Sequence, residues 1–188
     1  RTSLQRIILT DLEDGFPAES RRPAASEPHT AFYPDILEKG KHRPLPAVSA
    51  GSDEVAMLQY TGGTTGVSKG AMLTHRNLIA LQGQARAFWP IIEEGKEVVM
   101  AFLPFFHIYG QVVVMIAGLA QGSTLVLFTT PEIDEILSAM EHYQASGFYG
   151  VPTLFEYLKE YEKTDRVDWK RLKLIVCGAD TLHESTID

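Results

Sequence analysis

Short uninterrupted apolar runs recur along the chain, and their pattern predicts β-strands. Valine, isoleucine and leucine follow one another in these runs without strict alternation with polar residues. Runs of this kind are typical of strands that are covered on both faces. The predicted strands are Arg6–Leu9, Val55–Tyr60, Val98–Phe102, Thr124–Phe128 and Leu172–Val176.

Segments whose apolar residues recur with helical periodicity lie between these runs. The first predicted helix is His75–Phe88, with Thr74 as its cap. Its apolar residues at helical spacing are Leu78, Leu81, Ala85 and Phe88. The second helix, Glu132–Ala145, follows a predicted cap at Thr130 and a first turn at Pro131, and the third begins at Pro152. Alternating strands and helices predict an α/β fold with a mainly parallel sheet and helices on both faces.

Two polar segments are predicted to be loops. Asp11–Pro46 is rich in proline, glutamate, serine and arginine, with a weak turn at Asp35–Gly40, and Glu93–Glu97 is a short charged turn. Between Val98 and Pro131 there is no aspartate, glutamate, lysine or arginine. Because Pro104 would break a helix within this stretch, the pattern predicts a strand, a loop and a buried helix, and not a membrane span.

Composition narrows the function classes. With 45% hydrophobic and 22% charged residues, the chain has the make-up of an ordinary globular protein. Its net charge of −7 argues against a nucleic-acid binder. The single cysteine, Cys177, cannot form an internal disulfide and is expected to be a small buried residue of a cytoplasmic protein. No signal peptide opens the sequence, and both ends are expected to be cuts through a longer protein.

The segment Tyr60–Gly70, YTGGTTGVSKG, is the strongest candidate for a binding site. Its glycines let a ligand approach the backbone, and successive N–H groups in such a turn form a concavity that holds an anion. Threonine and serine hydroxyls add donors, and Lys69 adds a positive charge. A polyphosphate is the anion that suits so many donors. The predicted phosphate-binding residues are Thr61, Gly62, Gly63, Thr64, Thr65, Gly66, Ser68 and Lys69.

Two other interpretations of this loop fit less well. In a Walker loop the lysine follows a glycine, whereas here Ser68 precedes Lys69 and Gly70 follows it. The next residues, GAMLTH, indicate a strand, so the loop is predicted to join two strands and not to open a helix. A plain hairpin tip would not need four hydroxyls and a lysine.

Three segments carry a resemblance to a known family. The stretch YTGGTTGVSKGAMLTHRNL resembles the phosphate-loop signature of the acyl-adenylate-forming superfamily, and it is most similar to that of long-chain fatty acyl-CoA synthetases. LPFFHIYG, at Leu103–Gly110, resembles the next core motif of that family, in which a histidine or an aromatic ring faces the acyl pocket. A looser match joins FYGVPTLFEYL to LKLIVCGAD, where Cys177 stands in place of the glycine of many members.

The resemblance implies that residues 1–188 are part of an AMP-binding (adenylate-forming) domain, truncated at both ends. The implied enzyme uses ATP and Mg²⁺ to activate a fatty carboxylate as acyl-AMP and then transfers the acyl group to CoA. By this resemblance Thr64, Thr65 and Lys69 align the phosphates, and Gly178 and Ala179 lie beside the adenine. The implied acyl and CoA pocket comprises Phe106, His107, Tyr109, Gly110 and Val151.

Several alternatives stay open. The family's metal ligand and catalytic lysine have no counterpart in these residues, so the 188-residue chain alone is expected to be inactive. Peripheral contact with a membrane, without a transmembrane span, is compatible with a fatty substrate. An aryl- or medium-chain acyl-CoA ligase is one alternative function, and a nucleotide-binding module without catalysis is another. A purely structural domain would not need the phosphate loop.

Overall fold

The computed structural model describes residues 7–9, 30–61 and 68–184 of the chain. Contacts within it group the chain into two units, Arg1–Ser49 and Ala50–Asp188. All candidate site residues belong to the second unit. The prediction of one partial domain over residues 1–188 stays a prediction.

The first unit contains two short parallel strands and a helix. β1 (Ile7–Leu9) pairs with β2 (Thr30–Phe32), and α1 (Tyr33–Gly40) follows directly. The loop predicted over Asp11–Pro46 is therefore wrong from residue 30 to residue 40, and residues 11–29 lie outside the described ones. A proline and Asp35 in the first turn favour this helix, although none of its residues is buried.

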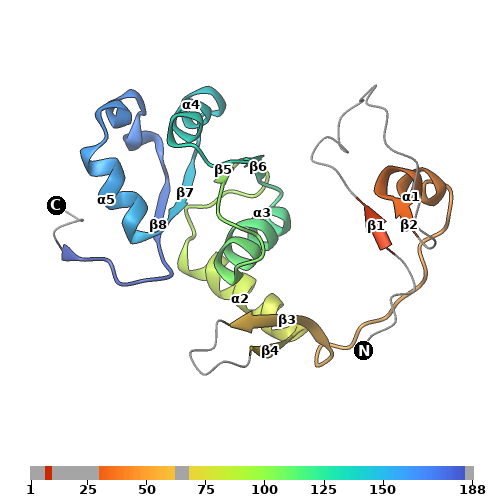
Figure 1. The fold of residues 1–188 in the computed structure, drawn as a ribbon. Coiled ribbons are helices and arrows are strands. Elements are labelled where there is room, and N and C mark those ends of the chain that lie inside the picture. The colour runs from red at the N-terminus through yellow and green to blue at the C-terminus, as the bar shows by residue number, and fades with distance from the viewer. Residues whose placement is uncertain (1–6, 10–29, 62–67, 185–188) are drawn as a thin grey trace. The chain divides into compact units, whose positions relative to one another are not determined.

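Four parallel strands form the sheet of the second unit (Figure 1). In spatial order they are β6 (Thr124–Leu127), β5 (Val98–Ala101), β7 (Gly147–Gly150) and β8 (Leu174–Cys177). Strands β5 and β6 pair along their full length, as do β7 and β8, whereas β5 meets β7 at Val99 and Gly147. The predicted α/β fold with a mainly parallel sheet is confirmed.

Strand β7 is missing from the sequence-based prediction. Its four residues, GFYG, include two glycines, which weaken a strand on local grounds. All four are buried, and a Cβ atom on Gly147 would lie 3.3 Å from Cγ2 of Val99. Burial among neighbouring elements therefore accounts for this strand better than local propensity does.

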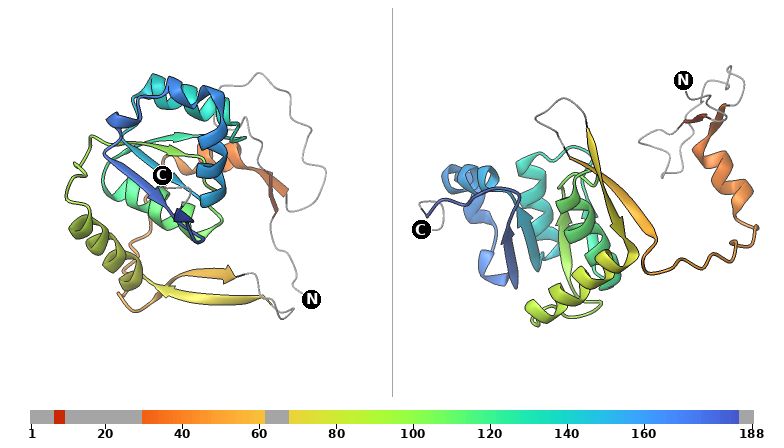
Figure 2. Two further views of the ribbon diagram at one scale, coloured as in Figure 1. Left: turned by 90° about the vertical axis from the view of Figure 1, so that its left-hand side faces the viewer. Right: turned by 90° about the horizontal axis from the view of Figure 1, so that it is seen from below.

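Helices cover both faces of the sheet (Figures 1 and 2). They are α4 (Ile133–Tyr143), α5 (Pro152–Glu160), the π-helix η1 (Tyr109–Ile116) and its continuation α3 (Ala117–Ala120). On one face, residues of α4 and α5 pack with Met100 and Phe148. On the other face, η1 packs with Val99 and Tyr149. Two short 3-10 helices, η2 (Glu162–Arg166) and η3 (Trp169–Arg171), lead into β8.

The uncharged stretch Val98–Pro131 folds as predicted. It forms β5, a loop, the helices η1 and α3, and β6. Within the part of the chain that the structure describes, no helix is both long enough and apolar enough to cross a membrane.

Helix α2 (His75–Phe88) confirms the first predicted helix and its cap. Oγ1 of Thr74 accepts a hydrogen bond from the Asn77 N–H (3.2 Å), and Asn77 Oδ1 accepts one from the Thr74 N–H (2.9 Å). These two bonds form a capping box, which satisfies two backbone donors at the start of the helix.

The inward face of α2 matches the predicted apolar positions at Leu78 and Ala85 but not at Leu81 and Phe88. Leu81 and Phe88 are 39% and 78% exposed. The half-buried residues on and just after the helix are His75, Leu78, Gln82, Ala85 and Trp89, which repeat at spacings of about three to four as a helix face does. The larger ring of Trp89 takes the inward position at the end of the helix.

The cap predicted for the second helix is wrong. The residue before α4 is Glu132, and its side chain makes no capping hydrogen bond. The Glu132 N–H donates to the carbonyl oxygen of Thr130 (2.9 Å), so Thr130 and Pro131 form a tight turn ahead of the helix. The third helix does begin at Pro152, as predicted.

Strands β3 (Val55–Thr61) and β4 (Lys69–Thr74) form an antiparallel hairpin. Thr61 lies opposite Lys69, so the glycine-rich segment connects the two strands. The prediction that this loop joins two strands, with no helix opening at Lys69, is confirmed.

A polar network lies at the amino ends of the central strands. The residue immediately before each strand is polar: Glu97 precedes β5, Ser146 precedes β7 and Lys173 precedes β8. The buried Glu97 carboxylate accepts hydrogen bonds from the Ser146 hydroxyl (2.5 Å), the Lys173 ammonium (2.9 Å) and the Glu93 N–H (2.8 Å). Burial by itself raises the pKa of Glu97, but these donors outweigh it and hold the pKa below its ordinary value.

Candidate functional site

The order of the strands identifies one edge of the sheet as a place for a ligand. From β5 the chain passes to β6 on one side and then returns to β7 on the other side of β5. In open parallel sheets, ligands bind beyond the carboxyl ends of the strands at such a reversal point. Residues 102–108 follow β5, Val151 follows β7, and Gly178 follows β8. The predicted acyl, CoA and adenine residues therefore gather at this edge.

Tyr109 connects the loop after β5 with the carboxyl ends of β7 and β8 through hydrogen bonds. Its hydroxyl lies 3.1 Å from the carbonyl oxygen of Val176 and 3.3 Å from that of Gly150, and it donates its proton to these acceptors. The Gly178 N–H donates to the same Gly150 carbonyl (3.1 Å). Burial raises the pKa of Tyr109, with smaller contributions from Cys177 and Tyr149, so the phenol stays protonated as a donor.

Replacing Tyr109 by phenylalanine is expected to lower the free energy of unfolding by about 1–2 kcal/mol, because the two carbonyl groups lose their shared donor. Urea unfolding followed by circular dichroism measures this change. Tyr143→Phe is the matched control: Tyr143 is 51% exposed, so the same substitution there should change stability by less than about 0.5 kcal/mol. Equal effects in the two variants would contradict the anchoring role of Tyr109.

One ring nitrogen of His107 is hydrogen-bonded to the backbone. Its Nδ1 accepts a hydrogen bond from the Tyr109 N–H (3.2 Å). In the neutral ring the proton is then on Nε2, which becomes a donor. His107 is exposed, and its neighbour Phe106 is 84% exposed. This arrangement suits contact with a substrate oxygen and leaves no free nitrogen lone pair for general base catalysis.

Two of the predicted glycines lie where a side chain would clash, at Gly110, or be crowded, at Gly178. Gly110 is buried in η1, and a Cβ atom there would lie 2.4 Å from the carbonyl oxygen of Pro104. A Cβ atom on Gly178 would lie 3.1 Å from Cζ of Tyr109. π-Helical turns are rare and frequently occur at functional sites. The tight loop before η1 is therefore consistent with a binding site at this edge of the sheet.

The other two predicted residues also lie at the carboxyl ends of the strands. Val151 is the half-buried N-cap residue of α5 and packs with the side chains of η1 and β5. Ala179 is exposed and has a positive φ of 73°. A non-glycine residue in this region carries strain, which concentrates at ligand sites.

The phosphate-loop prediction falls partly outside the described residues. Gly62, Gly63, Thr64, Thr65 and Gly66 are not among them. The hydroxyl of Thr61 donates to the carbonyl oxygen of Lys69 (3.4 Å), and Ser68 and Lys69 are exposed at the loop end of the hairpin. The two strands thus hold the ends of the loop together.

A contact that the sequence did not reveal links the hairpin to the edge of the sheet. The side-chain amide of Gln59, on β3, donates to the carbonyl oxygen of Phe106 (3.3 Å). It connects the phosphate-loop hairpin with the loop that carries His107. A polar residue inside the apolar run VAMLQY is the only sequence signal for it.

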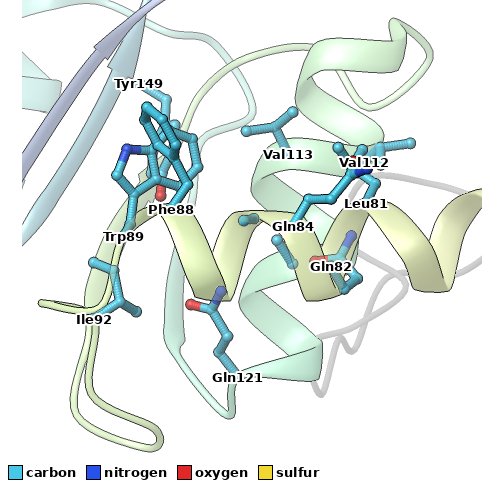
Figure 3. A pocket seen from close by; sticks show the side chains of 12 residues that line it. Leu81, Gln82, Gln84, Phe88, Trp89, Ile92, Val112, Val113, Gln121 and Tyr149 are labelled. Carbon is cyan, nitrogen blue, oxygen red and sulfur yellow. The ribbon is translucent and has the colours of Figure 1, made fainter.

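An apolar cavity of about 240 Å³ lies between α2 and the helices η1 and α3 (Figure 3). Tyr149, from the middle of the sheet, and Val112 and Val113, from η1, line it opposite the end of α2. Because Tyr149 directly precedes Gly150, the cavity lies behind the predicted binding edge. Sequence analysis did not predict this cavity.

Comparison with known families and proteins gives consistent matches. A family model described as AMP-binding enzyme matches residues 3–188. The long-chain-fatty-acid–CoA ligase of Haemophilus influenzae is 32% identical over 203 residues, covering 98% of this chain and 36% of the relative. The enzyme of the same description from Bacillus subtilis is 33% identical over 145 residues, covering 77% of this chain and 26% of the relative. The chain thus spans about a third of the length of such relatives.

Solved structures agree with this match. The crystal structure of ATP-bound MatB from Rhodopseudomonas palustris superposes with a TM-score of 0.70 at 26% identity. The superposition covers 84% of this chain and 31% of that one.

Proposed function

Because the chain belongs to the AMP-binding enzyme family, we propose that the protein carrying it is an ATP-dependent long-chain fatty acid–CoA ligase. In the first step, a carboxylate oxygen of the fatty acid attacks the α-phosphorus of ATP, and pyrophosphate leaves. In the second, the CoA thiol attacks the acyl carbon, forming the thioester and releasing AMP. A cytoplasmic location with peripheral membrane contact belongs to the same proposal.

The apolar cavity behind the binding edge is the main observation in favour of a fatty substrate. Its lining is mainly apolar, from α2, η1 and Tyr149. Its volume of about 240 Å³ is just below the range of about 300–1,000 Å³ usual for small-molecule pockets, so it would hold part of a long alkyl chain. The fatty acyl relatives named above support the same substrate class.

The proposed residue roles follow from the family resemblance and, for the described residues, also from their positions. The donors at residues 61–69 hold the β- and γ-phosphates, with Thr64, Thr65 and Lys69 aligning the leaving pyrophosphate. The Nε2–H of His107 contacts the substrate carboxylate. Gly178 and Ala179 lie on the adenine side, and Tyr109 fixes their distance from the loop after β5.

Mg²⁺ would accompany ATP and offset phosphate charge. Within the described ranges 7–9, 30–61 and 68–184, no group of three or more His, Cys, Asp or Glu side chains is arranged to hold a metal ion. The proposal therefore assigns no metal ligand to these residues.

Exchange of labelled pyrophosphate into ATP tests the proposal in the full-length protein. Palmitate should stimulate exchange strongly, and an aromatic acid or hexanoate only weakly. Stronger stimulation by the aromatic or the short acid would favour the aryl- or medium-chain alternative. ATP binding without exchange for any acid would favour a nucleotide-binding module.

Thr64→Ala should lower kcat for adenylation by about ten- to a hundredfold with little change in the KM for ATP. A hydrogen bond to a charged group contributes about 1.5–3 kcal/mol, and this one is expected to strengthen as charge moves onto pyrophosphate. Pyrophosphate release at saturating ATP measures the change. Thr130→Ala, at an exposed threonine of the turn before α4, is the matched control. A raised KM with unchanged kcat would mean that Thr64 contributes only to ground-state binding.

A further inference from the structure

Strand β3 carries a polar residue on its more buried face. Met57 and Gln59 are the half-buried residues of this strand, and because they are two positions apart their side chains lie on the same face. The more buried face of an antiparallel strand usually carries apolar side chains. Gln59 instead places an amide there, two residues before the strand ends at Thr61.

The amide of Gln59 holds one backbone atom of the loop after β5. Its Nε2 donates to the carbonyl oxygen of Phe106 (3.3 Å). Phe106 belongs to a turn in which the His107 N–H donates to the carbonyl oxygen of Pro104 (3.1 Å). The Phe106 side chain is 84% exposed, so its own packing does not hold this carbonyl. The hydrogen bond from Gln59 therefore restrains the backbone directly before His107.

Gln59 is also fixed to the ends of the phosphate loop. In the ladder between β3 and β4, Gln59 lies opposite Ala71 and Thr61 lies opposite Lys69. The Thr61 hydroxyl donates to the carbonyl oxygen of Lys69 (3.4 Å). One side chain thus joins the hairpin assigned to the phosphates of ATP with the loop assigned to the substrate carboxylate.

Adenylation is the step that needs these two segments at a fixed separation. The carboxylate oxygen must approach the α-phosphorus in line while the pyrophosphate is held as the leaving group, and a misplacement of about 1 Å can slow such a reaction by about a hundredfold. Thioester formation does not depend on this separation, because pyrophosphate has left before the CoA thiol attacks the acyl carbon.

We propose that Gln59 is a positioning residue for adenylation, whose amide holds the phosphate-loop hairpin and the His107 loop in register for attack on ATP. This inference rests on the proposed function, because it takes residues 61–69 as the phosphate site and His107 as the carboxylate contact. It goes beyond that function by assigning a role to a residue that contacts neither substrate and by restricting this role to the first of the two steps.

Gln59→Met in the full-length protein tests this role, because methionine is close to glutamine in length but has no N–H donor. The kcat for adenylation, measured as pyrophosphate release at saturating ATP and palmitate, should fall about three- to tenfold, the loss expected for one hydrogen bond. The KM values for ATP and palmitate should change by less than about twofold, since each segment still binds its own substrate. The rate of thioester formation from supplied palmitoyl-AMP and CoA should be unchanged.

Gln144→Met is the matched control. Nε2 of Gln144 also donates to a backbone carbonyl oxygen, that of Glu141 (2.7 Å), but it does so at the end of α4. This variant should leave both steps unchanged. Gln59→Asn keeps an amide on a side chain that is one methylene shorter, so it should slow adenylation selectively as well. It serves as the second variant should circular dichroism show that Gln59→Met folds poorly.

The outcomes separate this role from the proposed function. Unchanged adenylation, or equal slowing of both steps, would refute the positioning role, because general destabilisation of the fold affects both steps alike. A raised KM for ATP with unchanged kcat would also refute it, since the effect would then lie in phosphate binding alone. If the wild type forms no acyl-AMP with any acid, the proposed function itself fails, and the role of Gln59 fails with it.

Discussion

Gly110→Ala is expected to lower the free energy of unfolding by about 3 kcal/mol or more, beyond the usual cost of overpacking. A Cβ atom at this position would lie 2.4 Å from the carbonyl oxygen of Pro104 and 2.9 Å from that of Leu103. Both are backbone atoms, so no side-chain rotation relieves the clash. The loop Leu103–Gly110 would have to move, and it carries His107 and the Tyr109 anchor. The variant should therefore also lose ligand binding at the edge of the sheet.

Gly83→Ala makes a sharp control for this prediction. Gly83 lies in the interior of α2, and a Cβ atom there would have no neighbour within 4 Å. Alanine in a helix interior is favoured over glycine by about 0.5–1 kcal/mol, so this variant should be more stable than the wild type. Urea unfolding of both variants measures the difference. A Gly110→Ala protein with wild-type stability would contradict the described path from Leu103 to Gly110.

The sequence predicted those parts of the fold that have a strong local signal. The run Val98–Phe102 reads as a buried strand because both of its faces are covered, and Thr74 caps α2 with the hydrogen-bonding chemistry expected of that residue. Strand β7 was missed because its two glycines give no strand signal and its burial comes from contacts with neighbouring elements. Helix α1 was missed because it is short, exposed and surrounded by loop-like composition.

The candidate site divides in the same way. Gly110 and Tyr109 could be identified because they belong to a contiguous motif, and the topology then places them beside Val151 and Gly178. The contribution of Gln59 depends on a contact between distant segments, and a single glutamine has no local signature. The chemistry of a motif is local, whereas the shape of a pocket is a tertiary property.

Glu97→Gln tests the network at the opposite end of the strands. In the wild type, one carboxylate oxygen of Glu97 accepts from the Glu93 N–H and the Lys173 ammonium, and the other accepts from the Ser146 hydroxyl. Glutamine has a single acceptor oxygen, so its NH₂ group must replace one of these acceptors. Its neutral amide also gives up the charge-assisted bonds. The variant should lose about 1.5–3 kcal/mol of stability at pH 7.

The pH dependence of this loss has a defined sign. The folded-state pKa of Glu97 lies below its ordinary value of 4.5, so the stabilisation by the carboxylate is fully present above that pH and declines as the pH falls through the folded-state pKa. The difference between the wild type and Glu97→Gln should therefore be constant from pH 7 to about pH 5 and shrink on further acidification. Glu94→Gln, at a neighbouring side chain that is 78% exposed, should change stability by less than about 0.5 kcal/mol. Urea unfolding across this pH range measures both variants, and a Glu97→Gln difference that grows on acidification would show that the buried carboxylate destabilises the fold.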